Sequence, residues 1–368
     1  MGDLIPISRS FVVQLRACER RAFYQYRAKL NPAQKNGGLV WPRQNPDLAI
    51  GTGVHLMFEL LWVDRSTSVE VLVAKAWESE GLANGRANGF SLVDAFNQER
   101  FVEHLNLLLT GMAWLAREYV VPSLLDTYTL IKSELELRPR VVDGLALQGR
   151  TDAVFKGSFD NPTIFSLKTA ATYGEKNAGM QDYDTQGLSE SLLYHDEFKE
   201  WPEVQMVTLV KGKKKKLDGM VTYEGPLTRM YRKVYVKEAK PVAYSPKYTT
   251  GWDSISVAEY PGGALGYYNQ VLAGTVELER TWARPMPGLR NQRAAEDVVK
   301  FMFRDAKVFW ENPSEDPADY APNVEACLSY GGLCPYHDAC QKFVPLESLG
   351  FIERTPHHPA LDDMDVAA

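Results

Sequence analysis

Hydrophobic residues recur every three or four positions in the first third of the chain and at alternate positions in its middle. The helical spacing predicts helices over residues 11–27, 48–62 and 92–119. The alternating pattern, interrupted by turn-forming residues, predicts strands over residues 127–142, 145–156 and 163–167. A helical part is therefore expected to lead into a strand-rich part.

The second half of the chain returns to helix. The pattern predicts a helix over 184–194, a strand over 204–210, a strand pair within 220–236 and a helix over 288–311. Residues 248–262 show no clear period and are expected to form a loop, and the polar residues 355–368 are expected to be disordered. The order of these elements predicts an α/β fold.

Composition narrows the class of protein. The chain has 368 residues, of which 45% are hydrophobic, and a net charge of −6, as expected of a globular protein with one large core or two moderate ones. Neither a signal peptide nor a membrane span is visible, and four cysteines are too few for a disulfide scaffold, so we expect a cytoplasmic location. The acidic total does not exclude nucleic acid, because a local basic surface is enough to bind it.

The cysteines are unevenly distributed. Cys18 lies near the start of the chain, and Cys327, Cys334 and Cys340 lie within fourteen residues near the end. Three thiolates so close in sequence can converge on one centre when a fourth comes from elsewhere, and four is the ligand number of a tetrahedral zinc site or a 4Fe–4S cluster. Such a centre would hold the two ends of the chain together. The alternative is four unrelated buried thiols, which pack well as small hydrophobic groups.

Two charged residues stand inside predicted strands. Asp152 follows Gly149 in one strand, and Lys168 ends the next. Buried charges at such positions need compensation, which a divalent metal on the acid and a phosphate near the lysine would supply. An exposed Asp–Lys pair on a strand face is the plainer interpretation of these two residues alone.

These residues follow the order of motifs in a known family. Cys18 comes first, Gly51 with His55 second, Gly-Arg-Thr-Asp ending at Asp152 third, Leu-Lys-Thr around Lys168 fourth, and the three clustered cysteines last. Over about residues 8–345 this order resembles the RecB-like branch of the P-D-(D/E)-x-K nuclease superfamily, which includes iron–sulfur nucleases related to AddB and the CRISPR-associated RecB-like exonucleases.

The resemblance implies a fold and an activity. It implies one restriction-endonuclease-like domain over 1–345, with a mixed sheet flanked by the helix that carries His55 and the helix over 184–194. A helical part (1–120), a nuclease core (121–240) and a cysteine-bearing part (241–345) would make up this domain, and 346–368 would be a tail. The implied function is a metal-dependent DNA exonuclease or end-processing nuclease with a structural 4Fe–4S cluster. Its partners would be DNA ends or single strands, and recombination, replication or CRISPR-type proteins.

The resemblance also implies roles for individual residues. His55, Asp152 and the Leu167 carbonyl would bind Mg²⁺ or Mn²⁺, Lys168 would stabilise negative charge on the phosphate, and Gln186 would position the substrate backbone. The thiolates of Cys18, Cys327, Cys334 and Cys340 would bind the cluster, with zinc as the alternative metal.

Two departures from the family pattern bear on activity. The cysteine spacing is C-x6-C-x5-C, and Ser166 stands where the family has its second acid. A hydroxyl is a poor ligand for a hard divalent ion, so another carboxylate is needed. Glu190, one turn after Gln186 on the next predicted helix, is the leading candidate, and Glu134 and Glu136 are weaker ones. Without a replacement acid, the chain would be an inactive, DNA-binding or complex-forming relative.

Basic residues form two groups with a possible role in DNA binding. One is the run Lys211, Lys213, Lys214, Lys215 and Lys216, and the other is Arg16, Arg20 and Arg21 around the first cysteine. Each group is a candidate for contacts with DNA phosphates. A lysine run in a hairpin is otherwise simply a solvated turn.

Overall fold

The computed structural model covers the chain with gaps at some loops and both ends. It describes residues 4–36, 39–42, 45–91, 93–157, 161–172, 184–217, 220–225, 227–235, 250–256, 258, 262–272, 282–283, 292–327, 334–342, 344, 349 and 351–353.

A mixed six-stranded sheet lies at the centre of the molecule. Its strands are β1 (Ile5–Ser8), β4 (Thr129–Val142), β5 (Leu145–Lys156), β6 (Pro162–Ala170), β7 (Glu203–Val210) and β12 (Trp282–Ala283). The order is β1-β5-β6-β7-β12, and β4 pairs with β5 as well. The β1–β5 and β6–β7 pairs are parallel, and the others are antiparallel. The predicted α/β class and mixed sheet are confirmed.

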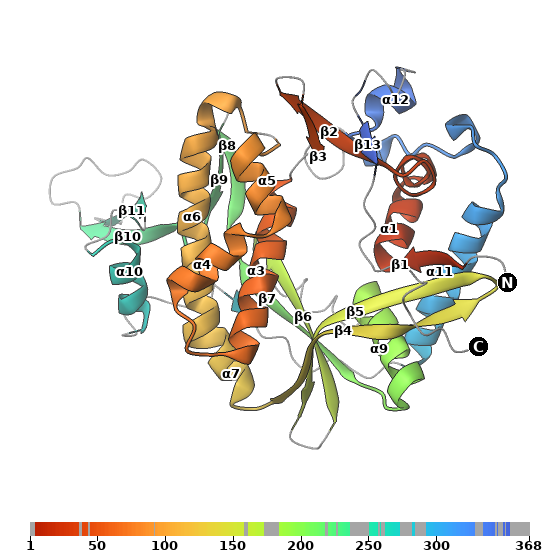
Figure 1. Ribbon diagram of the computed structural model, residues 1–368. Coiled ribbons are helices and arrows are strands. Elements are labelled where there is room, and N and C mark those ends of the chain that lie inside the picture. The colour runs from red at the N-terminus through yellow and green to blue at the C-terminus, as the bar shows by residue number, and fades with distance from the viewer. Residues whose placement is uncertain are drawn as a thin grey trace.

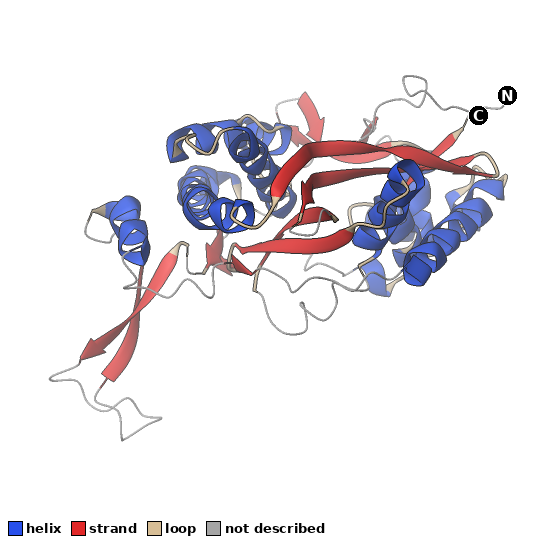
Figure 2. Ribbon diagram, turned by 90° about the horizontal axis from the view of Figure 1, so that it is seen from below, coloured by secondary structure: helices blue, strands red, loops and turns tan. Residues whose placement is uncertain are grey.

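Helices cover both faces of this sheet (Figures 1 and 2). On one face lie α3 (Pro46–Val63), α4 (Val69–Trp77), α5 (Glu80–Asn88), α6 (Gln98–Leu115) and α7 (Val121–Leu125). On the other lie α1 (Arg9–Ala17), α9 (Thr185–Phe198) and α11 (Gln292–Glu311). Successive side chains of a strand point to opposite faces of the sheet and so pack into different cores. On β5 and β6, Phe155 and Phe165 pack with the first group of helices, while Val154 and Ile164 pack with the second.

The helix predicted over 11–27 is broken at Cys18. Ser8 caps α1 by accepting a hydrogen bond from the Phe11 N–H, and the helix ends where Cys18 adopts an extended backbone (φ −168°, ψ 112°). A short helix α2 (Glu19–Ala22) and a π-helical turn (Phe23–Arg27) follow. The break turns the cysteine out of the helix, toward the segment near residue 323.

The helix predicted over 92–119 is shorter than expected. A 3₁₀ turn (Ala95–Asn97) precedes α6, and a π-helical turn (Ala116–Val120) follows it. Phe96, which fits the apolar period, is 94% exposed and so does not belong to the buried face. The helices α4 and α5 were not predicted, although Ser68 caps α4 in the usual way.

The strand pairing predicted within 220–236 is wrong. In the structure β9 (Met220–Glu224) pairs with β8 (Lys213–Leu217), and β10 (Arg229–Tyr235) pairs with β11 (Thr250–Ser256). The loop predicted over 248–262 therefore contains a strand. The β10–β11 pair projects from the body (Figure 2), and residues 250–256 carry no hydrophobic alternation in the sequence that would mark them as a strand.

The remaining elements are short. They are β2 (Leu30–Asn36), β3 (Leu39–Pro42), α10 (Gly263–Leu272), a 3₁₀ turn (Pro317–Asp319), α12 (His337–Gln341) and β13 (Phe351–Glu353). The segment predicted to be a tail from residue 346 thus contains a strand, which pairs with β2 while Phe351 stacks on Tyr336. Residues 355–368 lie outside the described residues. Among the described helices, none combines the length and apolar character needed to cross a bilayer.

Candidate metal centre and cysteine region

The candidate metal centre lies where β5 changes partners within the sheet. On one edge β5 pairs with β1 as far as Gln148 and with β6 from Ala153 onward. Residues 149–152 lie between these two ladders, at the point where the neighbouring strands diverge. We call this point the β5 junction. Main-chain groups and side chains there are left free to face a ligand.

Three potential metal ligands meet at the β5 junction. His55 on α3, Glu134 on β4 and Asp152 on β5 each offer a ligand atom, and these atoms all lie within 4.8 Å of one another. The His55 Nδ1 is 3.2 Å from Asp152 Oδ1. Ligands around one divalent ion at bond lengths of about 2.1–2.5 Å have similar separations, so the set fits Mg²⁺ or Mn²⁺.

The backbone of Leu167 on β6 fixes two of these side chains. Its N–H donates to Asp152 Oδ2 at 2.6 Å, and its carbonyl lies 3.1 Å from His55 Nε2. Because a carbonyl only accepts, Nε2 carries the proton, and Nδ1 is the nitrogen that faces the acids. The Leu167 carbonyl accepts this hydrogen bond and so orients His55, and its predicted role as a metal ligand stays a prediction.

Glu134 reaches the centre through an unusual backbone. It stands between Ser133 and Leu135, which pair with Ala153 and Thr151, so it lies opposite Asp152 across the ladder. Its φ is +47°, in the left-handed region that a glutamate in a strand rarely adopts. Such strain is concentrated at functional sites. The sequence offered Glu134 only as a weaker candidate, because neither its cross-strand partner nor its φ can be read from the residue pattern.

Lys168 and Glu190 are linked through Gln186. The Lys168 Nζ donates to Gln186 Oε1 at 2.6 Å, and Gln186 Nε2 donates to Glu190 Oε1 at 2.8 Å. Glu190 is buried, and within the described part of the chain its Oε2 has no hydrogen-bond partner. Although Glu190 is outside the three-residue group, it lies close enough to Asp152 and Lys168 to feel their charges. Its predicted role as a ligand stays a prediction.

Ser166 lies on β6, two residues before Lys168, and its side chain points to the same face of the sheet as that lysine. It is fully buried, and its hydroxyl has no partner among the described residues. Lys168 contacts α9 through Gln186. Two unpaired buried oxygens, one on Ser166 and one on Glu190, are expected where a cation or water belongs.

The pKa values at the centre reflect its burial and its charges. Burial lowers the pKa of His55, but the hydrogen bond and charge of Asp152 outweigh it and raise the pKa. Burial raises the pKa of Asp152, but His55 and Lys168 together hold it below its usual value. Burial raises the pKa of Glu134 to about 7 and that of Glu190 to about 8, in both cases with help from the Asp152 charge. A cation at this place would relieve both glutamates.

The four cysteines come from both ends of the chain and lie near one another. Cys18, Cys327 and Cys340 are buried, and Cys334 is partly buried. Cys18 Sγ accepts a hydrogen bond from the Asn323 N–H at 3.4 Å, and the Cys334 N–H donates to the Cys327 carbonyl at 2.7 Å. We call these four residues with Asn323 the cysteine region.

Electrostatic contacts connect all four thiols. Burial raises the pKa of Cys327, and the neighbouring Cys340 and Cys18 raise it further. Burial also raises the pKa of Cys334, where Cys327 and Cys18 add to the shift and Arg21 opposes it. Among the described residues, no three of the sulfurs lie within 4.8 Å of one another.

The predicted DNA contacts differ in their surroundings. Arg16 pairs with Asp305 at 2.7 Å, and Arg20 donates to the Tyr320 carbonyl and, at 3.6 Å, to Cys340 Sγ. Arg21 is half-buried, its Nε has no partner among the described residues, and its charge reaches Cys334. Arg20 and Arg21 thus interact with the cysteine region, whereas Arg16 is exposed. The predicted contacts of all three with DNA stay predictions.

Three of the five lysines also have acidic partners. Lys211 is buried and contacts Asp47 at 2.5 Å, Lys214 contacts the same carboxylate at 2.8 Å, and Lys215 pairs with Glu224. Within the described part of the chain, Lys213 and Lys216 form no ion pair, and both are exposed on β8.

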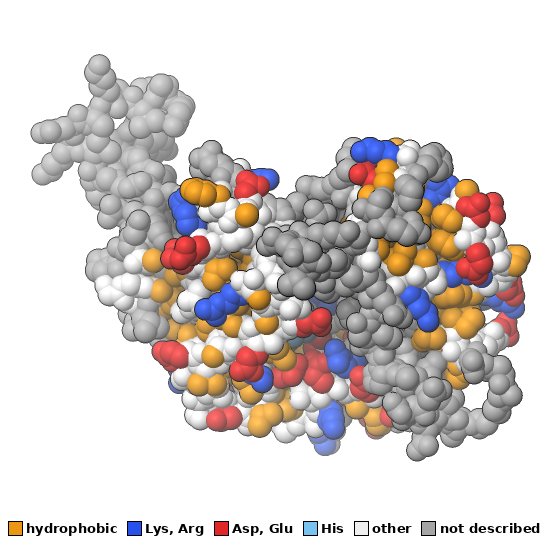
Figure 3. Space-filling view, turned by 45° about the horizontal axis from the view of Figure 1, so that its top comes forward, with side chains coloured by type: hydrophobic (Ala, Val, Ile, Leu, Met, Phe, Trp, Pro, Cys, Tyr) orange, Lys and Arg blue, Asp and Glu red, His pale blue; other side chains and the backbone are white. Residues whose placement is uncertain are grey.

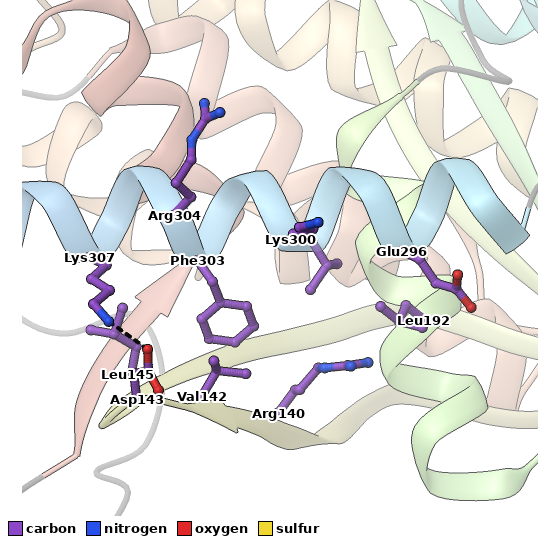
Figure 4. A pocket seen from close by; sticks show the side chains of 11 residues that line it. Arg140, Val142, Asp143, Leu145, Leu192, Glu296, Lys300, Phe303, Arg304 and Lys307 are labelled. Atoms are coloured by element: carbon purple, nitrogen blue, oxygen red, sulfur yellow. Dashed lines mark hydrogen bonds and ion pairs between the residues drawn. The ribbon is translucent and has the colours of Figure 1, made fainter.

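A groove of about 550 Å³ lies between the β4–β5 hairpin and α11 (Figure 4). Figure 4 shows Phe303 of α11 above Val142 of β4, with Lys307 paired to Asp143 at one end. Arg140, on its wall, pairs with Asp196 at 2.9 Å. Arg140 is six residues along β4 from Glu134, or about 20 Å at about 3.3 Å per residue, so the groove is separate from the metal centre.

In the space-filling view, Asp and Glu side chains gather near the middle of the face shown (Figure 3).

Comparison with known proteins identifies a family whose model the chain matches. The chain matches the family model described as the PD-(D/E)XK nuclease superfamily over residues 6–341. Among solved structures, the crystal structure of SSO0001 is 11% identical and covers 80% of this chain and 86% of that chain, with a TM-score of 0.20. We draw nothing from a likeness at that TM-score. No curated protein matches the chain.

Proposed function

Because the chain belongs to the PD-(D/E)XK nuclease superfamily, we propose that it is a metal-dependent deoxyribonuclease that acts at DNA ends or on single strands. The observation that carries the proposal is the meeting of His55, Glu134 and Asp152 at the β5 junction, with Lys168 close enough to lower the pKa of Asp152. This set combines metal ligands with a cation that can face a phosphate.

The residues divide the work of hydrolysis. His55 Nδ1, Glu134 and Asp152 would hold Mg²⁺ or Mn²⁺, which when bound supplies Lewis acidity and a more acidic water. Lys168, on the neighbouring strand, stabilises negative charge that develops on the phosphate. Gln186 holds the Lys168 ammonium in place, and Leu167 holds Asp152 and His55 through its backbone.

Two glutamates can supply the acid that Ser166 lacks. Glu134 is supported by its place within the three-residue group, and Glu190 by its unpaired buried oxygen and its nearness to Asp152 and Lys168. We propose that Glu134 binds the metal and that Glu190 adds a second carboxylate beside it, in the space that Ser166 leaves open.

A 4Fe–4S cluster is our proposal for the cysteine region. Zinc–thiolate bonds of about 2.3 Å in a tetrahedron place sulfurs about 3.8 Å apart. That no three of the described sulfurs lie within 4.8 Å of one another favours a cluster, in which each thiolate binds a different iron. The cluster would be structural, because its ligands join the two ends of the chain. Partner proteins of the recombination, replication or CRISPR type follow from the family resemblance alone.

The alternative is a nuclease fold that binds DNA without cutting it, and Ser166 is the observation that favours it. End-labelled single- and double-stranded DNA, incubated with Mg²⁺, with Mn²⁺ and with EDTA, separates the two functions. We expect metal-dependent loss of label from ends and none with EDTA. Absence of cleavage under every condition, with cleavage created by Ser166→Asp, would identify the inactive relative.

A further inference from the structure

Arg150 lies beside the candidate metal centre and pairs with Glu134, one of its three potential ligands. It lies on β5 two residues before Asp152, so both side chains emerge on the same side of the strand. Its Nε is 2.9 Å from Glu134 Oε2, and one terminal nitrogen is 4.0 Å from Glu136 Oε1. Glu59 of α3 is also within reach of its charge. The guanidinium therefore sits among three carboxylates at the β5 junction.

Glu134 is shared between Arg150 and the three-residue metal group. The same carboxylate that lies within 4.8 Å of the His55 and Asp152 ligand atoms also binds the guanidinium. A divalent ion bound there would have Glu134 on one side and the Arg150 guanidinium just beyond it. The two positive charges would then repel each other at short range. The ion and the arginine therefore compete for the negative charge of Glu134.

Arg150 is free to respond to this competition. Its side chain is 48% exposed, in contrast to the largely buried Asp152 at 12%. A guanidinium presents five N–H donors. Among the described residues, Nε and one terminal nitrogen of Arg150 form ion pairs, with Glu134 and Glu136, and the second contact, at 4.0 Å, is too long for a hydrogen bond. Donors therefore remain for a phosphate. A phosphate placed there would also neutralise the repulsion between the arginine and the ion.

We propose that Arg150 couples metal binding to DNA binding, holding Glu134 in the metal-free protein and turning to a DNA phosphate when the ion takes that carboxylate. This inference rests on the proposed nuclease function, which supplies the metal and the DNA. Coupling of this kind is reciprocal: if Mn²⁺ strengthens DNA binding through Arg150, DNA strengthens Mn²⁺ binding by the same factor. Arg150 is in this sense a positioning residue for the substrate strand.

The first test measures Mn²⁺ binding to DNA-free protein by electron paramagnetic resonance. For Arg150→Gln we expect the Mn²⁺ dissociation constant to fall about tenfold, because the competing cation is gone. Arg140→Gln is the matched control: Arg140 is on the same hairpin, is similarly exposed and also pairs with an acid, but faces the groove of Figure 4. Its Mn²⁺ affinity should equal that of the wild type.

The second test measures binding of a fluorescent single-stranded oligonucleotide with and without Mn²⁺, in a Lys168→Ala background that blocks cleavage. Mn²⁺ should raise DNA affinity about tenfold when Arg150 is present and less than twofold in Arg150→Gln. Arg150→Met also removes the charge and serves in both tests if the glutamine variant does not fold.

Three outcomes are decisive. Equal or weaker Mn²⁺ binding by Arg150→Gln overturns the inference, as does an equal Mn²⁺ effect on DNA binding with and without Arg150. If both tests succeed but the wild type cleaves no DNA, the nuclease proposal fails while the coupling stands.

Discussion

The metal centre and the cysteine region are both made of residues distant in sequence, but they are held in different ways. At the metal centre the sheet itself supplies the geometry: Asp152 is fixed by the Leu167 N–H, and Lys168 by Gln186. In the cysteine region the sulfurs lie at a break in helix α1 and in short turns, and contacts such as Asn323 to Cys18 join residues about 300 positions apart.

This difference separates a site that the fold creates from one that helps to create the fold. The β-ladders around the β5 junction persist whether or not a metal is bound, because their hydrogen bonds are between strands. Among the described residues next to Cys334 and Cys340, the regular structure is the five-residue helix α12. We therefore expect metal loss to cost activity at the first site and stability at the second.

The largest effect is expected from the cysteines. Cys18→Ala should lose the bound metal and lower the melting temperature by more than about 10 °C, because metal binding to such thiolates is also folding energy. Anaerobic purification, visible absorbance, metal analysis and thermal unfolding together measure this. Colourless wild-type protein with one zinc per chain would replace the cluster by zinc, and a variant as stable as the wild type would remove the structural role.

The next largest effect is expected at the metal centre, where substitutions should reduce activity more than stability. Asp152→Asn and Glu134→Gln should each reduce kcat by about a thousandfold, since a lost ligand removes several kcal/mol of stabilisation from the transition state. The melting temperature of Glu134→Gln should stay within about 2 °C of the wild type or rise, because burial already disfavours the Glu134 carboxylate in the folded protein. That of Asp152→Asn should fall by a few degrees (about 2–5 °C), because the folded protein favours the Asp152 carboxylate. A large loss of stability with either variant would mean that this centre also holds the fold together.

How far the sequence predicts each region follows from the same physics. The elements around the metal centre have regular periods, so β5 was predicted over its full length and α3 nearly so. The order of Asp152 and Lys168 along those elements was visible as well. The place of Glu134 was not, because it depends on strand register and on a backbone φ of +47°. Residues that neither alternate nor repeat, as in β11, gave no signal at all.

In the cysteine region the sequence predicts the residues but not the structure around them. Its residues could be chosen from sequence because cysteine is rare, with four in the chain. Their surroundings could not: the break of the first helix at Cys18 and the contact of Arg20 with Cys340 are both tertiary. Arg16 and Arg20, assigned to DNA from their charge, also make contacts within the protein, and their role in DNA binding stays a prediction.

A moderate, pH-dependent effect is expected at Glu190. Its pKa in the folded protein, about 8, exceeds the usual value of 4.5, so folding favours the protonated carboxyl. This stabilisation is complete below about pH 4.5 and is lost as the pH rises through 8. In EDTA-treated protein, the melting temperature of Glu190→Gln should fall less between pH 5 and 8 than that of the wild type. Parallel curves would show that Glu190 does not carry this charge.

The smallest effect is expected on β8, and it tests whether the lysine run has any role beyond packing. Lys213 and Lys216 are exposed and form no ion pair with described residues, whereas Lys214 shares Asp47 with the buried Lys211. Each lysine that contacts a DNA phosphate contributes about one unit to the slope of log affinity against log salt. Lys213→Gln with Lys216→Gln should therefore lower that slope by about two in a binding titration of short double-stranded DNA. Lys214→Gln, the matched control, should leave the slope unchanged and lower the melting temperature slightly, since it removes one partner of Asp47. An unchanged slope in the double variant would make the run a solvated hairpin and leave Lys168 and Arg150 as the cations proposed to face the substrate strand.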